Sequence, residues 1–149
     1  MSLSLSSPDF SNHEFIPSLY TCDGKGISPA LIWHAPPPHT QSLALIVDDP
    51  DAPRGVWSHW VLFNIPSNMR QLPEKTMIPT GATCGRNSWG KNEYGGPCPP
   101  HGTHRYFFTL YALDTVLHLN EKAAEQDVLT AMKGHILEQS VLIGLYSRS

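Results

Sequence analysis

The stretch Tyr94–Tyr106 reads YGGPCPPHGTHRY and runs directly into the apolar segment Phe107–Leu113. Its prolines remove backbone donors and fix φ, and its glycines permit tight turns, so no helix or central strand can pass through it. The aromatic and apolar residues that follow favour a strand. The pattern predicts a stiff loop that presents His104, Arg105 and Tyr106 at the start of that strand. The simpler alternative is a rigid connection whose polar side chains are only solvated.

A second stiff loop, Asp48–Trp60, reads DDPDAPRGVWSHW. It lies between two continuous apolar runs, Leu43–Val47 and Trp60–Ile65, which indicate central strands buried on both faces. Two proline-containing loops, each rich in Asp, His or aromatic residues and each at a strand end, indicate one composite pocket. The alternative for Asp48 and Asp51 is a local role as Asx turns before proline.

Strand signals also occur near both ends of the chain. Alternation over Ser2–Ser7 indicates a short edge strand, and His135–Tyr146 is typical of a terminal strand. Ala30–His34 and Val116–Leu119 indicate two more short strands. We therefore expect a mostly β protein.

Helical signals are confined to one late segment. Asn120 and Asp127 are candidate N-caps, and Gly134 is placed to end a helix that contains VLTAMK. No repeat or linker interrupts the chain, so residues 1–149 are expected to form one domain. The pattern predicts a β-sandwich with one or two short helices.

Composition excludes several classes of protein. The net charge is −3 and charged residues make up 15% of the chain, so there is no basic stripe of the kind that binds nucleic acid. No apolar run approaches the ~18 residues of a transmembrane helix. The N-terminus lacks the basic and apolar regions of a signal peptide, so a cytoplasmic location is expected.

The three cysteines are Cys22, Cys84 and Cys98. An odd number without a CxxC pair, in a chain without a signal peptide, predicts free thiols. A zinc site would need closer ligand spacing. A nucleophilic role for Cys98 is disfavoured because no base is evidently poised beside it.

The two loop motifs together carry a resemblance. DPDAP followed by WSHW, and then YGGPCPPxGxHRY, resemble the phosphatidylethanolamine-binding protein family, and within it the short prokaryotic branch of Raf-kinase-inhibitor-like proteins. The likeness extends to FIPSLYTCDG near the start of the chain and AMKGHIL near its end. It implies two antiparallel sheets with Greek-key connections and a pocket for phosphate-type headgroups at one end.

Donors from both loops define the candidate site. Imidazole N–H and phenol O–H groups, with backbone amides of a glycine-rich turn, can converge on an oxyanion. Carboxylates suit this task only if they fix a histidine tautomer or are themselves protonated and donate. The resemblance implies all of the residues given in the next sentence except Gly95 and Gly96, which are added because they lie in the glycine-rich turn. The candidate ligand-binding residues are Asp49, Asp51, Pro53, Trp57, His59, Gly95, Gly96, His104 and Tyr106. The alternative for His59 and His104 is that they are core histidines bonded to carbonyls.

Three functions are compatible with these residues. The favoured one is a non-enzymatic module that binds a phosphorylated or carboxylated small molecule. The second is an inhibitor of a kinase or a protease, and a homodimer is left open. The third is a metal-dependent hydrolase using Asp49, Asp51, His59 and His104. It is disfavoured by the absence of HExxH, GxSxG and Walker motifs, so we expect no catalytic residue, no bound metal and no cofactor.

The density of proline around the expected pocket leads to one conformational prediction. Tight turns concentrate cis X–Pro bonds, so at least one is expected among five prolines. These are Pro50, Pro53, Pro97, Pro99 and Pro100.

Overall fold

The computed structural model describes residues 2–148 and consists mostly of β-strands in two sheets. The larger sheet has six strands in the order β2-β9-β8-β4-β5-β7. Their bounds are Glu14–Phe15 for β2, Ser42–Asp49 for β4, Trp57–Pro66 for β5, Thr83–Cys84 for β7, His104–Leu113 for β8 and Ile136–Tyr146 for β9. All neighbours are antiparallel except β2 and β9.

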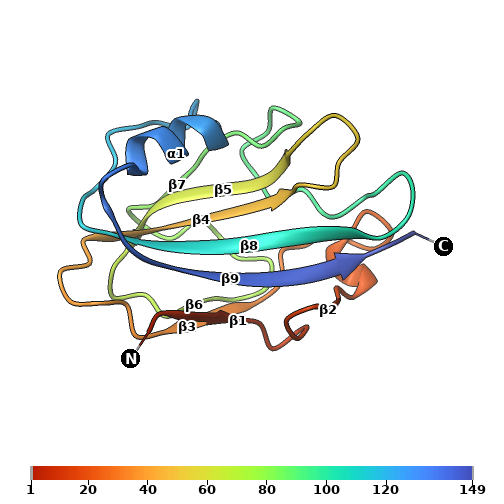
Figure 1. The fold of residues 1–149 in the computed structure, drawn as a ribbon, viewed down its shortest axis with the longest axis horizontal. Coiled ribbons are helices and arrows are strands. Elements are labelled where there is room, and N and C mark those ends of the chain that lie inside the picture. Colours follow the sequence, from red (N-terminus) through yellow and green to blue (C-terminus); the bar gives the residue numbers. More distant parts are fainter. Residues whose placement is uncertain (1, 149) are drawn as a thin grey trace.

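The smaller sheet has three antiparallel strands in the order β1-β3-β6. These strands are β1 at Ser4–Ser6, β3 at Leu31–His34 and β6 at Gln71–Leu72. A 3-10 turn, η1, covers Ser18–Tyr20, and the single α-helix, α1, covers Glu125–Met132. Figure 1 shows α1 beside β5 and the small sheet on the opposite side of the drawing, beyond β9. The predicted mostly β sandwich with few helices is confirmed.

Strand β4 is buried on both of its faces, as its unbroken apolar run predicts. Leu43, Leu45 and Val47 belong to the core between the two sheets. Ala44 and Ile46 belong to a second core, which the helix residues Val128 and Met132 complete. Successive side chains on a strand point to opposite faces, so a strand between two apolar layers must be apolar throughout.

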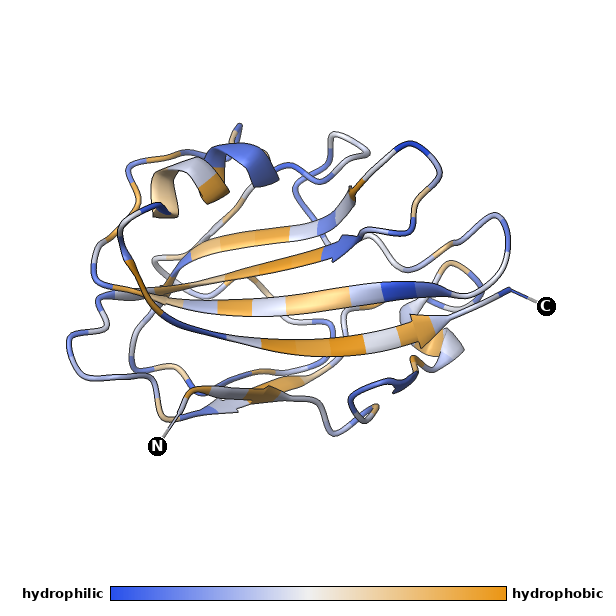
Figure 2. Ribbon diagram, viewed as in Figure 1, coloured by the Kyte–Doolittle hydropathy of each residue, from blue (hydrophilic) through white to orange (hydrophobic). Residues whose placement is uncertain are grey.

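The antiparallel pairing brings three strand ends together. Asp49, at the end of β4, pairs with Trp57, at the start of β5. Along the other edge of β4, Asp48 pairs with Phe107, close to the start of β8. Figure 2 shows hydrophilic residues gathered where β4 ends and β8 begins, while the middles of these strands are hydrophobic. The two stiff loops therefore meet at one end of the large sheet.

The predicted strand at Val116–Leu119 does not form. The side-chain amide of Asn64 donates to the carbonyl of Leu117 at 2.9 Å, and its oxygen accepts from the Leu117 amide at 2.8 Å. This side chain supplies the hydrogen bonds that a partner strand would otherwise provide, so the segment packs as irregular backbone.

The helix starts at Glu125 and its N-cap is Ala124, so neither of the two predicted residues is the N-cap. Asp127 lies in the first turn, and its carboxylate accepts from the backbone amide of Ala124 at 2.9 Å. Asn120 instead closes a local turn by accepting from the amide of Lys122. Gly134 follows the helix with a φ of 81°, as expected for a residue that ends one.

The prediction of free thiols is wrong for two of the cysteines. Cys22 and Cys98 form a disulfide across a sequence separation of 76 residues, and only Cys84 is a free, buried thiol. Spacing along the chain could not indicate this pair, because the fold alone brings the segment after η1 against the Tyr94–Thr103 loop, hereafter the proline loop.

The predicted cis proline is also wrong, since residues 2–148 contain no cis peptide bond. Glycines make the sharp reversals in the two loops instead. Gly55 and Gly102 have φ values of 108° and 66°, which glycine adopts without steric penalty.

Candidate functional site

A cavity of about 1010 Å³ opens between the two stiff loops. All the predicted site residues line it except Asp51. Trp89, Arg54 and Lys91 also line it, although the sequence did not single them out for the site. The two loops thus form the composite pocket that their positions at strand ends predict.

His104 and Asp49 form a buried pair at this cavity. The Nδ1 atom of His104 lies 2.6 Å from Oδ2 of Asp49, and the two residues are 7% and 3% exposed. The carboxylate accepts a hydrogen bond from the protonated Nδ1, which fixes the ring tautomer and leaves Nε2 for a ligand. The other Asp49 oxygen accepts from the amide of Asp51 at 2.8 Å. Asp49 therefore forms the Asx turn before proline and orients His104 at the same time.

His59 is oriented by the proline loop. Its Nδ1 atom lies 2.7 Å from the carbonyl oxygen of Gly95, which can only accept, so Nδ1 carries the proton. Burial lowers the pKa of His59 below its ordinary value of 6.5, against the opposing effects of the Gly95 carbonyl and Asp49. His59 is thus neutral at pH 7, bonded to a carbonyl like a core histidine and yet part of the cavity wall.

Tyr106 contributes a buried hydroxyl without a partner. The residue is 1% exposed, and its hydroxyl makes no hydrogen bond of good geometry within residues 2–148. Burial, together with the charge of Asp49, raises the pKa of Tyr106 against the opposing effect of the nearby Cys98 backbone amide, so the phenol stays protonated. The rings of His59 and His104 lie 5.2 and 6.5 Å from the Tyr106 ring. One phenol and two imidazole rings are therefore neighbours at one cavity.

Gly95 and Gly96 serve close packing. A Cβ on Gly95 would lie 2.1 Å from the indole of Trp89, and one on Gly96 would lie 2.8 Å from the carbonyl oxygen of Tyr20. The amide of Gly95 already donates to the carbonyl of His59 at 2.9 Å. It is therefore engaged within the protein and is not available as an anion donor.

Trp57 and Trp89 form an aromatic wall of the cavity. Trp57 lines the cavity and packs edge to face with Trp89 at 5.4 Å, while Trp89 also packs on His59 at 5.0 Å. Trp60 is 2% exposed and belongs to the core between the sheets. No sequence pattern identified Trp89 as part of the site.

Asp51 points away from the cavity and binds Arg105. Its carboxylate accepts from the backbone amide of Arg105 at 2.9 Å and from the guanidinium at 2.9 and 2.8 Å. The guanidinium lowers the pKa of Asp51 to about 2. Alternation along β8 explains this arrangement, since His104 and Tyr106 face the cavity and Arg105 between them faces outward. Asp51 therefore joins the two loops on the outside and does not orient a histidine.

Within residues 2–148, no group of three or more His, Cys, Asp or Glu side chains is arranged to hold a metal ion. No helix there is long and apolar enough to cross a membrane.

Comparisons with known sequences agree with the motifs. A family model described as phosphatidylethanolamine-binding protein matches residues 6–147. The chain is 53% identical over 150 residues to a UPF0098 protein of Methanothermobacter thermautotrophicus, covering 98% of this chain and 99% of that protein. It is 49% identical over 148 residues to a UPF0098 protein of Aquifex aeolicus, covering 95% and 86%.

Solved structures give the same result. A phosphatidylethanolamine-binding protein homologue from Chlamydia trachomatis superposes with a TM-score of 0.94 at 40% identity, covering 99% of each chain. YbcL of E. coli, described as a member of the mammalian family, superposes with a TM-score of 0.94 at 29% identity over the whole of both chains. Sequence, fold and relatives therefore agree that this chain belongs to the phosphatidylethanolamine-binding protein family, in its prokaryotic branch.

Proposed function

We propose that this protein is a non-enzymatic module that binds a small oxyanion, either a phosphate monoester or a carboxylate, in the cavity between its two stiff loops. The unpartnered, buried hydroxyl of Tyr106 carries this proposal. A buried polar group without a hydrogen bond is unfavourable, and an anionic oxygen in the cavity would relieve this with a charge-assisted hydrogen bond.

The histidines support the same function. Both rings use Nδ1 within the protein, His59 on a carbonyl and His104 on a carboxylate. Each therefore offers only Nε2 to a ligand. With the proton on Nδ1, the Nε2 of a neutral ring is an acceptor, so it donates to an oxyanion only after the ring takes up a second proton.

Charged side chains also line the cavity. Arg54 and Lys91 line it together with Glu93, while the carboxylate of Asp51 is held outside by Arg105. Asp49 is the carboxylate that remains among the donor rings, and its contact with His104 directs its charge at an imidazole. The expected cytoplasmic location is part of this proposal.

The binding test is an NMR titration of the labelled protein with inorganic phosphate and with phosphoethanolamine. We expect saturable shifts at the amides and imidazoles of β5 and β8 that face the cavity. Affinity should rise as the pH falls below about 6.5, the unperturbed histidine pKa, because only a protonated ring donates from Nε2. Shifts confined to surface lysines, or no saturation with either ligand, would refute the proposal.

A further inference from the structure

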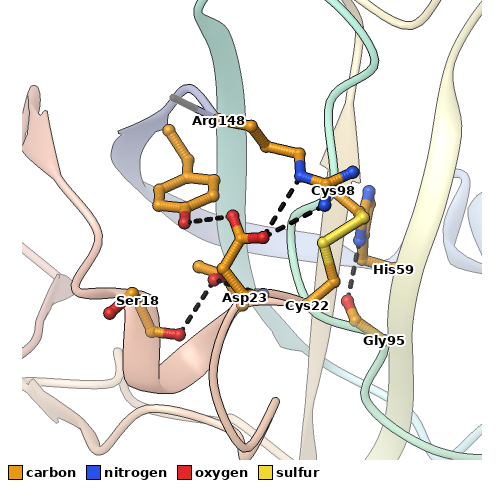
Figure 3. The surroundings of a disulfide bond; sticks show 9 residues. Ser18, Cys22, Asp23, His59, Gly95, Cys98 and Arg148 are labelled. Atoms are coloured by element: carbon orange, nitrogen blue, oxygen red, sulfur yellow. Dashed lines mark hydrogen bonds and ion pairs between the residues drawn. A yellow bond between two sulfur atoms is a disulfide. The ribbon is translucent and has the colours of Figure 1, made fainter.

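The Cys22–Cys98 disulfide lies at the edge of the proposed binding cavity. Both cysteines line that cavity, and both are exposed to solvent. Figure 3 shows the disulfide close to Gly95 and His59, with Asp23 beside Cys22. Exposed disulfides are more easily reduced than those sealed in a core, because a thiolate must reach one of the sulfurs.

Before Cys98, the proline loop has several attachments besides the disulfide. The hydroxyl of Tyr94 donates to the carbonyl of Tyr20 at 2.7 Å, and the carbonyl of Pro97 accepts from the amide of Cys22 at 3.1 Å. Gly95 exchanges two hydrogen bonds with His59. This half of the loop is therefore held whether or not the sulfurs are joined.

After Cys98, the disulfide is the last bonded attachment before β8, although Pro99 is buried. Residues 99–103 make no hydrogen bond to any other residue in 2–148, and all of them except Pro99 are exposed. The next fixed residue is His104, which binds Asp49. The Cys98 sulfur thus anchors the segment that leads into the two donors of β8, His104 and Tyr106.

We propose that the Cys22–Cys98 disulfide is a redox switch that sets the anion affinity of the cavity. This inference rests on the proposed function. A dithiol reductant donates two electrons through a mixed disulfide: the S–S bond breaks, each cysteine sulfur gains a proton, and the reductant becomes a disulfide. Reduction releases residues 99–103 and loosens the start of β8, so the donor rings are no longer held in one arrangement.

Cys84 takes no part in this exchange. It is buried on β7, and burial raises the pKa of its thiol to about 11, so at neutral pH it is neither accessible nor ionised. It therefore provides a matched control on the same chain.

The test compares phosphate affinity in the oxidised and dithiothreitol-reduced wild-type protein, with free thiols counted in each state. We expect reduction to weaken phosphate binding by about fivefold or more, which is within the range of ordinary coupling between sites. Cys22→Ser and Cys98→Ser should match the reduced protein, and Cys84→Ser should keep the full response. By reciprocity, phosphate should make the disulfide harder to reduce. Equal affinities in two states of proven thiol content, or failure of dithiothreitol to release two thiols, would overturn the switch.

A second readout separates this inference from the proposed function. If neither redox state binds phosphate, the proposed function fails. Hydrogen exchange at Arg105, whose amide donates to Asp51 at 2.9 Å, then decides whether the disulfide holds the start of β8. Faster exchange after reduction supports the loosening of this strand end, and unchanged exchange refutes it.

Discussion

At the scale of single residues, the site depends on what each polar group does when no ligand is present. His59 and His104 are each satisfied at Nδ1, whereas the Tyr106 hydroxyl is buried without a partner. An unsatisfied buried hydroxyl costs about 1–3 kcal/mol, which a bound anion would offset. Tyr94 offers a contrast, because its hydroxyl donates to the carbonyl of Tyr20 at 2.7 Å.

Tyr106→Phe should therefore leave the free energy of unfolding unchanged or raise it, while phosphate binding weakens by about tenfold, the value of one charge-assisted hydrogen bond. Tyr94→Phe, the matched control, should lower the free energy of unfolding, because it leaves the Tyr20 carbonyl without its donor. Urea unfolding and phosphate titration of both variants check this. Equal destabilisation by the two substitutions would show that the Tyr106 hydroxyl already has a partner.

At the scale of elements, α1 and β4 meet through two acidic side chains. Glu125 begins α1, and Asp48 lies near the end of β4, on the face opposite Asp49. Burial, together with the contact with Asp48, raises the pKa of Glu125 to about 8. Burial likewise raises the pKa of Asp48. One proton is thus held between helix and sheet at neutral pH.

This pair predicts a pH dependence of stability. Because the folded-state pKa of Glu125 exceeds the ordinary value of 4.5, its contribution to stability is complete below about 4.5 and declines as pH rises to about 8. Glu125→Gln, which stays neutral, should remove this decline and make the variant more stable than wild type at alkaline pH. Denaturant unfolding across this range measures the effect.

Asp51 provides a control with the opposite sign. Its pKa is lowered to about 2 by Arg105, so its contribution is present above 3.8 and declines as pH falls toward about 2. Asp51→Asn should therefore lower the free energy of unfolding by a constant amount at neutral pH, remove the decline below about pH 3.8, and leave the slope between about pH 5 and 8 unchanged. A Glu125→Gln profile that still falls between about pH 5 and 8 would show that another group is responsible.

At the scale of the whole molecule, the sequence predicts strands better than contacts between loops. The apolar runs were sufficient to predict strands β4 and β8, because a strand between two hydrophobic layers is apolar on both faces. The strand predicted at Val116–Leu119 does not form, because the backbone of Leu117 is hydrogen-bonded to the side chain of Asn64, far away in the chain. Sequence spacing cannot reveal such a partner.

The candidate site was predictable to a similar degree. Its two loops could be paired because strand ends collect at one edge of a sheet, and eight of its nine predicted residues line one cavity. The role of Asp51 was missed, although the alternation of His104, Arg105 and Tyr106 places a cation outside the cavity, beside it. The disulfide and Trp89 lay beyond prediction, because both depend on how irregular segments pack.

The most direct test of the binding site is a calorimetric titration of phosphate into wild type, His59→Ala, His104→Ala and His101→Ala. His101 is exposed in the proline loop and does not line the cavity, so it is the matched control. At a pH low enough to protonate the imidazoles, we predict that the first two substitutions each weaken binding by about tenfold or more, as expected for the loss of a charge-assisted donor, and that His101→Ala binds like wild type. Equal weakening by all three substitutions, or no binding by the wild-type protein, would contradict the assignment of this cavity as an oxyanion site.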